Sequence, residues 1–325
     1  MKEALIKLHV AIFLAGTSGL FGKWVTLSET ALVWYRAMLS LIILTIVLAI
    51  TRRLRLIAMD HLLRIGVVGL ILVTHWIFFY ASIKAANVSV GVVCLSAVAF
   101  ITALIEPLCT SKAKFSLRDI LLSVISVAGI VCIFSFDAQY RLGILYGLIS
   151  STLIALLMIA NRQLRTLTIK SPSFCKPDEH EGKRYSSWFM FLIQLCVGFV
   201  LLSLYILVST LIGCGGSLAD TLSAIRADYT PTQTDWIFLI ILAAVVTITP
   251  YALKIDSLKY VSAFTVNLAN NMEPVYSIIL AAVLFNEMEE LNAAFFVGVS
   301  LIALSVVLQT MTLKKGEMTM GKNLK

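Results

Sequence analysis

Charged side chains are scarce in this sequence. Of its 325 residues only 14% are Asp, Glu, Lys or Arg, whereas 59% are hydrophobic, and the mean hydropathy is +0.94. Soluble domains usually contain about 25% charged and about 45–50% apolar residues. A chain of this length could bury a large core, but it has too few charges to cover that core with a wettable shell. The composition therefore excludes an ordinary soluble protein and indicates an integral membrane protein.

Several motifs of catalysis, metal binding and cross-linking are also missing. The six cysteines form no C-x-x-C pair, so neither a disulfide framework nor a metal site is supported. The four histidines are dispersed, and neither H-E-x-x-H nor the nucleotide loop G-x-x-x-x-G-K-[ST] occurs. We therefore expect no metal, no cofactor and no built-in ATPase. The net charge of +8 would point to nucleic acid in a soluble protein, but here cytoplasmic loops explain it, so no nucleic-acid partner is expected.

Ten apolar runs are long enough to span a lipid bilayer, which takes roughly 20 residues each. The alternating pattern of a membrane barrel is absent. If the N-terminus is cytoplasmic, 21 of the 26 Lys and Arg residues fall on the cytoplasmic side. We predict an all-α integral membrane protein of ten transmembrane helices with both termini cytoplasmic. The runs are 4–25, 29–51, 60–84, 87–110, 117–135, 142–161, 186–212, 235–255, 261–286 and 291–313.

The chain contains an internal repeat. The pattern S-[IL]-K followed by V-S occurs in "YASIKAANVSVGVV" and again in "KIDSLKYVSAFTV". Two five-helix halves follow, 1–135 and 142–313, with a cytoplasmic tail at 314–325. Because five is odd, the halves have inverted topology, which is typical of carriers whose site lies at the midplane between repeats. The cytoplasmic loop 162–185 and the extracytoplasmic loop 213–234 are interpreted as connectors.

These segments resemble a known family. "HWIFFYASIKAANVSVGVV" with "ALIEPL", and "PYALKIDSLKYVSAF" with "NMEPVYSIILAAVLFNE", are similar to the paired EamA repeats of the drug/metabolite transporter superfamily. One departure is Ala97, where many members carry a proline. The resemblance implies a multi-pass protein of a cell membrane, such as a bacterial inner membrane, that moves a small organic solute such as an amino acid, a sugar or a drug. It does not select the solute, and a homodimer stays open.

The ninth span contains the polar stretch "LANNMEPVYS". Asn267, Asn270, Asn271 and Pro274 fall on one stripe of a helix, and Glu273 lies beside it. Charged groups inside a membrane face the bundle interior or a wet cavity because lipid exposure is costly. We expect the asparagines to bind solute, Glu273 to exchange a coupling proton, and Pro274 to free the carbonyl of Asn270. The alternative is that the amides only hold helices together.

Five further residues are candidates for the same cavity or its entrances. Arg36 is expected to bind an anionic group or, alternatively, to reach the membrane surface. His75 and Trp76 lie near the centre of the third span, where His75 is either a pocket wall or a packed core residue. Tyr276 is expected to line the cavity or the core. Glu106, nearer the cytoplasm, is expected to gate or to pair with a loop cation.

Two other classes of function remain open at this point. "GTSG" places Ser18 in a pattern found in intramembrane serine proteases, with His75 as a conceivable base. Small residues in a membrane helix are, however, ordinary packing positions. A passive channel is the other alternative, although neither a repeated filter nor a ring of charges is visible. The residues favour a secondary carrier, with proton coupling through Glu273, over both.

Overall fold

The structure is a computed structural model of the chain. It describes residues 2–109, 140–164, 167–169, 182–257 and 272–286, with short pieces between 121 and 132 and between 293 and 308. Over these residues the fold is helical, and it also contains an isolated antiparallel β-bridge between Thr168 and Arg184.

In the first half of the chain, the described helices match the predicted apolar runs 4–25, 29–51, 60–84 and 87–110. The first run is interrupted at Thr17, and the fourth run contains a short 3-10 turn, η1. The helices are α1 (Lys2–Gly16), α2 (Ser18–Trp24), α3 (Glu29–Ile50), α4 (Met59–Ala85), α5 (Val88–Cys94), η1 (Leu95–Ala97) and α6 (Val98–Cys109).

The described part of the second half adds two long helices, one short helix in a loop, one helix with a π-helical centre and a last helix, α14. The π-helical segment, η3, joins α11 to α12 within the predicted run 235–255. The elements are α8 (Arg141–Leu164), α9 (Ser187–Gly213), α10 (Leu218–Asp228), α11 (Gln233–Ile241), η3 (Leu242–Ile248), α12 (Thr249–Ser257) and α14 (Glu273–Phe285).

In the part of the chain that the structure describes, five helical stretches are long and apolar enough to cross a membrane. They are Glu29–Ile50, Met59–Ala85, Arg141–Leu164, Ser187–Gly213 and Gln233–Leu253, and Tyr276–Phe285 is a shorter apolar helix. The predicted runs 117–135 and 291–313 lie largely outside the described residues, and the run 261–286 is described only from Met272. The multi-pass helical class is therefore confirmed, whereas ten helices and two cytoplasmic termini stay predictions.

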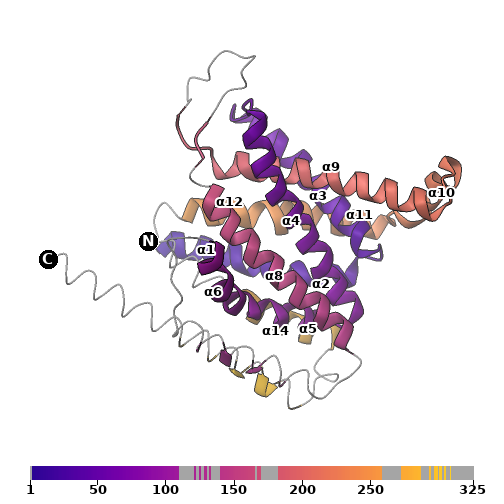
Figure 1. Ribbon diagram of the computed structural model, residues 1–325. Helices are drawn as coiled ribbons and strands as arrows, with labels where there is room; N and C mark the ends of the chain where they lie inside the picture. Colours follow the sequence, from indigo (N-terminus) through magenta and orange to yellow (C-terminus); the bar gives the residue numbers. More distant parts are fainter. Residues whose placement is uncertain are drawn as a thin grey trace.

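Helix α4 lies inside the bundle and packs against α8 and α9 along much of its length (Figure 1). The crossing with α9 is close because it is made by glycines. A Cβ atom added to Gly69 would lie 2.2 Å from the Gln194 carbonyl oxygen, and one added to Gly198 would lie 2.8 Å from that of Gly69. Small residues at such crossings let helices approach closely where lipid supplies no hydrophobic drive.

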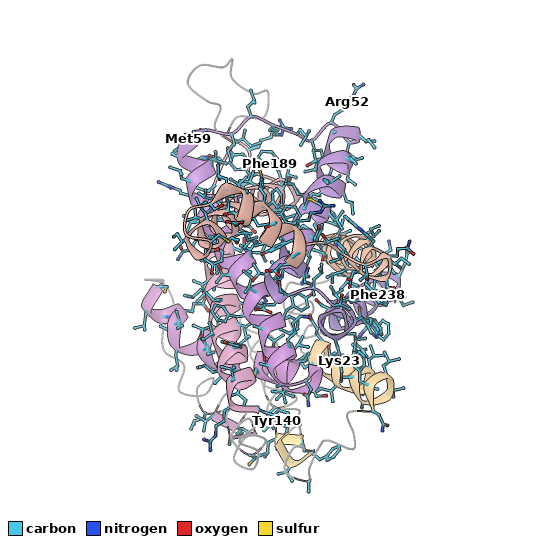
Figure 2. The ribbon with its side chains drawn as sticks, turned by 90° about the vertical axis from the view of Figure 1, so that its right-hand side faces the viewer. Lys23, Arg52, Met59, Tyr140, Phe189 and Phe238 are labelled. Atoms are coloured by element: carbon cyan, nitrogen blue, oxygen red, sulfur yellow. The ribbon has the colours of Figure 1, made fainter. Side chains whose placement is uncertain are left out.

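Helices α3 and α4 form an antiparallel hairpin. Figure 2 shows Arg52 and Met59, which flank the loop between these helices, at one end of the molecule, and Tyr140, just before α8, at the other.

Side-chain caps fix several helix starts, because each satisfies a backbone N–H that has no partner inside the helix. Ser28 caps α3 in this way and Asn87 caps α5.

Candidate functional site

The site is built around Arg36, whose guanidinium is buried in the bundle. Only 6% of this residue is exposed. The structure therefore places Arg36 inside the bundle and not at the membrane surface, which was the alternative. Its Nη1 donates to the Tyr80 hydroxyl at 3.0 Å and, at 3.4 Å, to the Ser18 hydroxyl. Its Nε donates to Thr247 Oγ1 at 3.0 Å. The guanidinium also lies over the Trp76 ring, 4.0 Å from the ring centroid.

The partners of Arg36 come from both halves of the chain. Ser18 begins α2 and Tyr80 belongs to α4, both in the first half, whereas Thr247 belongs to η3 in the second. Glu273, at the start of α14, also attracts the guanidinium electrostatically. In the described part of the chain, however, no carboxylate lies within ion-pair distance of Arg36. The cation is therefore held by neutral hydroxyls and an aromatic face.

Thr247 takes its position from the π-helical geometry of η3. Its hydroxyl donates to the Leu242 carbonyl, five residues earlier, at 2.8 Å and accepts from Arg36. Thr249 makes the same i−5 bond to Ala244. Pro250 follows directly and carries no N–H, which weakens the regular α-helical ladder here. Single π-helical turns inside α-helices are frequent at functional sites.

The break at Thr17 presents Ser18 to this site. The Thr17 hydroxyl donates to the Leu14 carbonyl, and α2 begins one residue later. Ser18 Oγ lies 3.1 Å from the Tyr80 hydroxyl. On the other side of the break, Gly16 lies against α14, because an added Cβ would meet the Glu273 carbonyl oxygen at 3.0 Å. The interruption of the helix at Thr17 thus places Ser18, a partner of Arg36, in the same region as Glu273.

His75 belongs to a neighbouring polar contact between α4 and α8. It is 6% exposed, and its Nδ1 lies 2.8 Å from the Ser150 hydroxyl and 3.0 Å from the Ser150 carbonyl oxygen. Its ring stacks on Phe79, with centroids 6.3 Å apart. This geometry gives His75 a partner within the bundle. It also argues against the protease alternative, since Ser18 pairs with Tyr80 and Arg36 while His75 pairs with Ser150.

The polar stretch of the ninth span is described only in part. Asn267, Asn270 and Asn271 lie outside the described residues, so their role in binding stays a prediction. Pro274 lies in the first turn of α14. There its missing N–H removes no hydrogen bond within the described helix. Tyr276 packs edge-on against Phe13 of α1, with centroids 5.6 Å apart.

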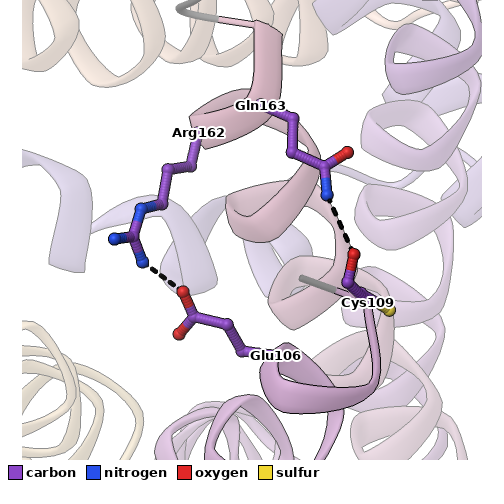
Figure 3. A network of polar contacts seen from close by, with 4 residues as sticks. All are labelled: Glu106, Cys109, Arg162 and Gln163. Carbon is purple, nitrogen blue, oxygen red and sulfur yellow. Dashed lines mark hydrogen bonds and ion pairs between the residues drawn. The ribbon is translucent and has the colours of Figure 1, made fainter. Parts of the chain in front are cut away.

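Glu106 forms an ion pair at the end of the bundle where α6 and α8 finish. Its Oε1 accepts from Arg162 Nη1, and beside it Gln163 Nε2 donates to the Cys109 carbonyl at 3.3 Å (Figure 3). Arg162 is one of the cations of the predicted cytoplasmic loop. The pair joins α6 to α8 at the predicted cytoplasmic side, and a gating role for Glu106 stays a prediction.

The opposite end of the bundle is held by Asp235, which is 1% exposed. Its Oδ1 accepts from the Thr26 backbone N–H at 2.8 Å and its Oδ2 from the Thr26 hydroxyl at 2.7 Å. The same carboxylate completes a capping box with Thr232 at the start of α11. Thr26 lies between α2 and α3, so this carboxylate ties the first half of the chain to the second.

An aromatic cluster of residues from α2, α11 and α14 also joins the two halves. Phe238 of α11 stacks on Trp24 of α2 at 5.4 Å and meets Phe21 edge-on at 6.1 Å. Phe285, the last residue of α14, contacts Trp24 at 5.7 Å and lies under the Lys23 ammonium at 4.6 Å. The predicted extracytoplasmic end is thus closed by contacts between residues far apart in the sequence.

Sequence reasoning missed Tyr80 and Thr247 at the Arg36 site, and Asp235 at the predicted outer end of the bundle. Tyr80 could have been found, because it lies one helical turn after Trp76 on the same helix. The "TITP" stretch was a weak signal for Thr247, since threonine and proline together disturb an α-helix. Asp235 belongs to the stretch "TQTD", a capping pattern that explains its position at the start of a helix. This pattern does not predict the hydrogen bonds of Asp235 to Thr26.

Comparison with known proteins agrees with this architecture. The fold defines a multi-pass helical membrane protein with two related halves. The model of the EamA-like transporter family matches residues 3–135 and again 179–311, and the chain belongs to this family. It is therefore a membrane transporter, and the predicted duplication is confirmed.

A solved structure titled "Crystal structure of protein" has the same fold, with a TM-score of 0.59 and 14% identity over 98% of this chain and 99% of the other. No curated protein matches. At this identity the solved structure shows the fold alone, so the solute must be argued from the site itself.

Proposed function

We propose that this protein is a secondary transporter that moves a small organic solute with an anionic group by alternating access, and that the solute binds at Arg36 between the two halves. The observation that carries the proposal is the buried guanidinium, which has contacts from α2, α4 and η3 and no ion pair among the described residues. A guanidinium offers five donors in a planar fork that suits carboxylate and phosphate groups.

The energetic argument starts from the cost of a cation in this position. Placing an arginine at the centre of a membrane helix costs about 2.5–3.5 kcal/mol on the insertion scale. Such residues face the bundle interior and mark solute or ion pathways. Neutral hydroxyls and the Trp76 ring offset part of this cost for Arg36, and no carboxylate of the described residues lies at ion-pair distance from its positive charge. A solute carboxylate or phosphate would supply the missing charge.

Glu273 is the group we propose for proton coupling. It attracts the Arg36 guanidinium electrostatically. A proton taken up by Glu273 would remove this negative charge and strengthen the attraction of Arg36 for an anionic solute. Release of that proton would weaken it. Solute and proton would then bind cooperatively, because each changes the field that the other meets.

Alternating access would use the contacts at the two ends of the bundle. Asp235 and Thr26 join the halves at the predicted outer end, whereas Glu106 and Arg162 join α6 and α8 at the predicted inner end. Opening to one side requires that the contacts on that side separate. The buried Asp235 tie is the stronger of the two, since Arg162 is 73% exposed and its ion pair is screened by water.

Counterflow in proteoliposomes tests the proposal. Vesicles loaded with unlabelled solute would be assayed for uptake of labelled amino acids, sugar phosphates and neutral sugars. We expect saturable counterflow of an anionic or zwitterionic solute, lost in Arg36→Gln. Arg36→Lys keeps the charge but not the planar fork, so it should retain weak binding. Flux that does not saturate would favour a channel, and equal transport by Arg36→Gln would exclude Arg36 as the binding group.

Coupling is tested separately with Glu273→Gln. We expect this variant to exchange solute across the membrane but to lose accumulation driven by a pH gradient. Retained pH-driven accumulation would eliminate the coupling role of Glu273 and leave the binding role of Arg36 intact.

A further inference from the structure

Ser40 lies on the buried face of α3 and has an unused hydroxyl group. The residue is 0% exposed, and its Oγ makes no hydrogen bond with any residue that the structure describes. Helix α3 has 22 residues, Glu29–Ile50, so Ser40 lies near the middle of a membrane-spanning helix. At that depth lipid supplies no hydrogen bond, and a polar group must be met by protein, by water or by a bound molecule.

Other hydroxyl groups of the bundle bond to their own helix. The buried Ser151 and Ser277 donate to the carbonyl four residues earlier, at 2.8 Å and 3.1 Å. Thr45, which belongs to α3 like Ser40, does the same at 2.7 Å. Ser40 does not make this bond, although the acceptor is available in the same helix. Because an unpaired buried hydroxyl is unfavourable, its presence in a native structure requires an explanation.

Ser40 follows Arg36 by one helical turn. Residues four positions apart lie on the same face of a helix, with their Cβ atoms about 5–6 Å apart. The Arg36 guanidinium also has an unused donor group. Its Nε and Nη1 make the hydrogen bonds described above, whereas its Nη2 makes none with the residues that the structure describes. The buried face of α3 therefore carries two unsatisfied polar groups within one turn.

These two groups together suit a solute with two functional groups. The guanidinium suits a carboxylate or a phosphate. The Ser40 hydroxyl both donates and accepts, so it suits a neutral hydroxyl group of the same kind. An ammonium group at Ser40 would be repelled by the guanidinium one turn away. A site that hydrogen-bonds a solute hydroxyl discriminates against the analogue without it, because the polar group of the protein then stays unpaired.

We infer that Ser40 is a specificity-determining residue of the solute site, where its hydroxyl binds a hydroxyl group of the solute while Arg36 binds the anionic group. This assignment rests on the proposed function at Arg36 and narrows the solute to a hydroxylated carboxylate or phosphate. The competing role for Ser40 is that of a small residue that lets helices pack closely, for which alanine would serve equally well.

Stability in the absence of solute is the first test. Ser40→Ala removes an unpaired hydroxyl, so we expect the melting temperature in detergent not to fall. Ser203→Ala is the matched control, because the Ser203 hydroxyl accepts from the Trp34 indole N–H and donates to the Phe199 carbonyl, both at 2.8 Å. This control should lower the melting temperature. An equal fall in Ser40→Ala would overturn the assignment, since the Ser40 hydroxyl would then have a partner within the protein.

Calorimetric titration of the detergent-purified protein is the second test. The probes are two pairs that differ by one hydroxyl: 3-hydroxypropyl phosphate with propyl phosphate, and 4-hydroxybutyrate with butyrate. In at least one pair we expect the hydroxylated member to bind roughly tenfold more tightly, as one additional hydrogen bond allows. Ser40→Ala should abolish this preference and leave the Kd of the other member unchanged, whereas Ser203→Ala should keep the preference. A packing role for Ser40 would not change the preference.

Arg36→Gln separates failure of this assignment from failure of the proposed function. Propyl phosphate and butyrate carry no hydroxyl, so their binding depends on Arg36 and not on Ser40. If Arg36→Gln abolishes their binding but the unchanged protein binds both members of each pair equally, the role of Ser40 is wrong and that of Arg36 stands. If Arg36→Gln binds every probe as tightly as the unchanged protein does, the proposed function is wrong. If the unchanged protein binds none of the four probes, the inferred class of solute is wrong.

Discussion

The Arg36 guanidinium lies on the face of the Trp76 ring, 4.0 Å from its centroid, with both residues buried inside the bundle. One residue is on α3 and the other on α4, so the contact fixes the guanidinium against one wall and leaves its edges for hydrogen bonds. Nη1 and Nε use those edges to reach Tyr80 and Thr247. The aromatic face thus determines the direction from which a solute anion can approach.

The first prediction concerns this cation–π contact. Trp76→Leu should weaken solute binding roughly tenfold or more, because a desolvated cation–π contact is worth about 2 kcal/mol. Trp76→Phe keeps an aromatic face and should recover part of the loss. The measurement is KM for counterflow together with the melting temperature in detergent. Trp188→Leu is the control, since Trp188 packs on Tyr251 and should lower stability without changing KM.

The second prediction concerns the hydroxyl of Thr247. Thr247→Val keeps the shape but removes both the acceptor for Arg36 and the donor to Leu242, so we expect a destabilisation of about 1–3 kcal/mol and reduced transport. Thr247→Ser should restore both. Thr249→Val removes only the bond to Ala244 within the same π-helical turn. If transport fell equally in Thr247→Val and Thr249→Val, the loss would come from the helix and not from Arg36.

Much of the fold can be predicted from the sequence because each membrane-spanning helix requires an apolar run of matching length. The boundaries of α3, α4 and α9 fall close to the runs 29–51, 60–84 and 186–212 for this reason. For Arg36 the sequence left two positions open, the bundle interior and the membrane surface, and the structure has it in the interior.

The partners of Arg36 were less accessible to sequence reasoning. Thr247 lies 211 residues away along the chain, and no local pattern links two such positions. Asp235 and Thr26, separated by 209 residues, are a second case. The "GTSG" stretch predicted close helix packing, which Gly16 and α14 bear out, but the break at Thr17 depends on contacts with other helices.

The third prediction concerns the crossing of α4 and α9. Gly69→Ala would place a methyl group 2.2 Å from the Gln194 carbonyl oxygen, so the two backbones must separate. We expect a loss of stability of about 1–3 kcal/mol, as overpacking typically costs, seen as a lower melting temperature in detergent. Gly213→Ala, at the open end of α9, meets nothing within 4 Å and should be tolerated. Similar melting temperatures for the two variants would show that the crossing of α4 and α9 accommodates a methyl group without loss of stability.

The fourth prediction concerns the buried tie at the predicted outer end. Asp235→Asn weakens the charge-assisted hydrogen bonds to Thr26, each worth about 1.5–3 kcal/mol, and should favour the outward-open state. The measurement uses Phe21→Cys, a 4% exposed position, in a background without native cysteines. A water-soluble thiol reagent added from outside should label it at least tenfold faster in Asp235→Asn. Asp220→Asn, on the exposed α10, is the control and should leave the rate unchanged.

The fifth prediction concerns the ion pair between Glu106 and Arg162. Arg162 is 73% exposed, so solvent screens the pair and Glu106→Gln should change the free energy of unfolding by less than about 1 kcal/mol. Its effect on transport should be larger than its effect on stability, because the pair joins α6 to α8 in the closed state and its loss eases opening towards the cytoplasm. The reversed pair, Glu106→Arg with Arg162→Glu, keeps the attraction and should restore the transport rate that either single change alters. A reversed pair that behaves like the worse single variant would mean that Glu106 acts through another partner.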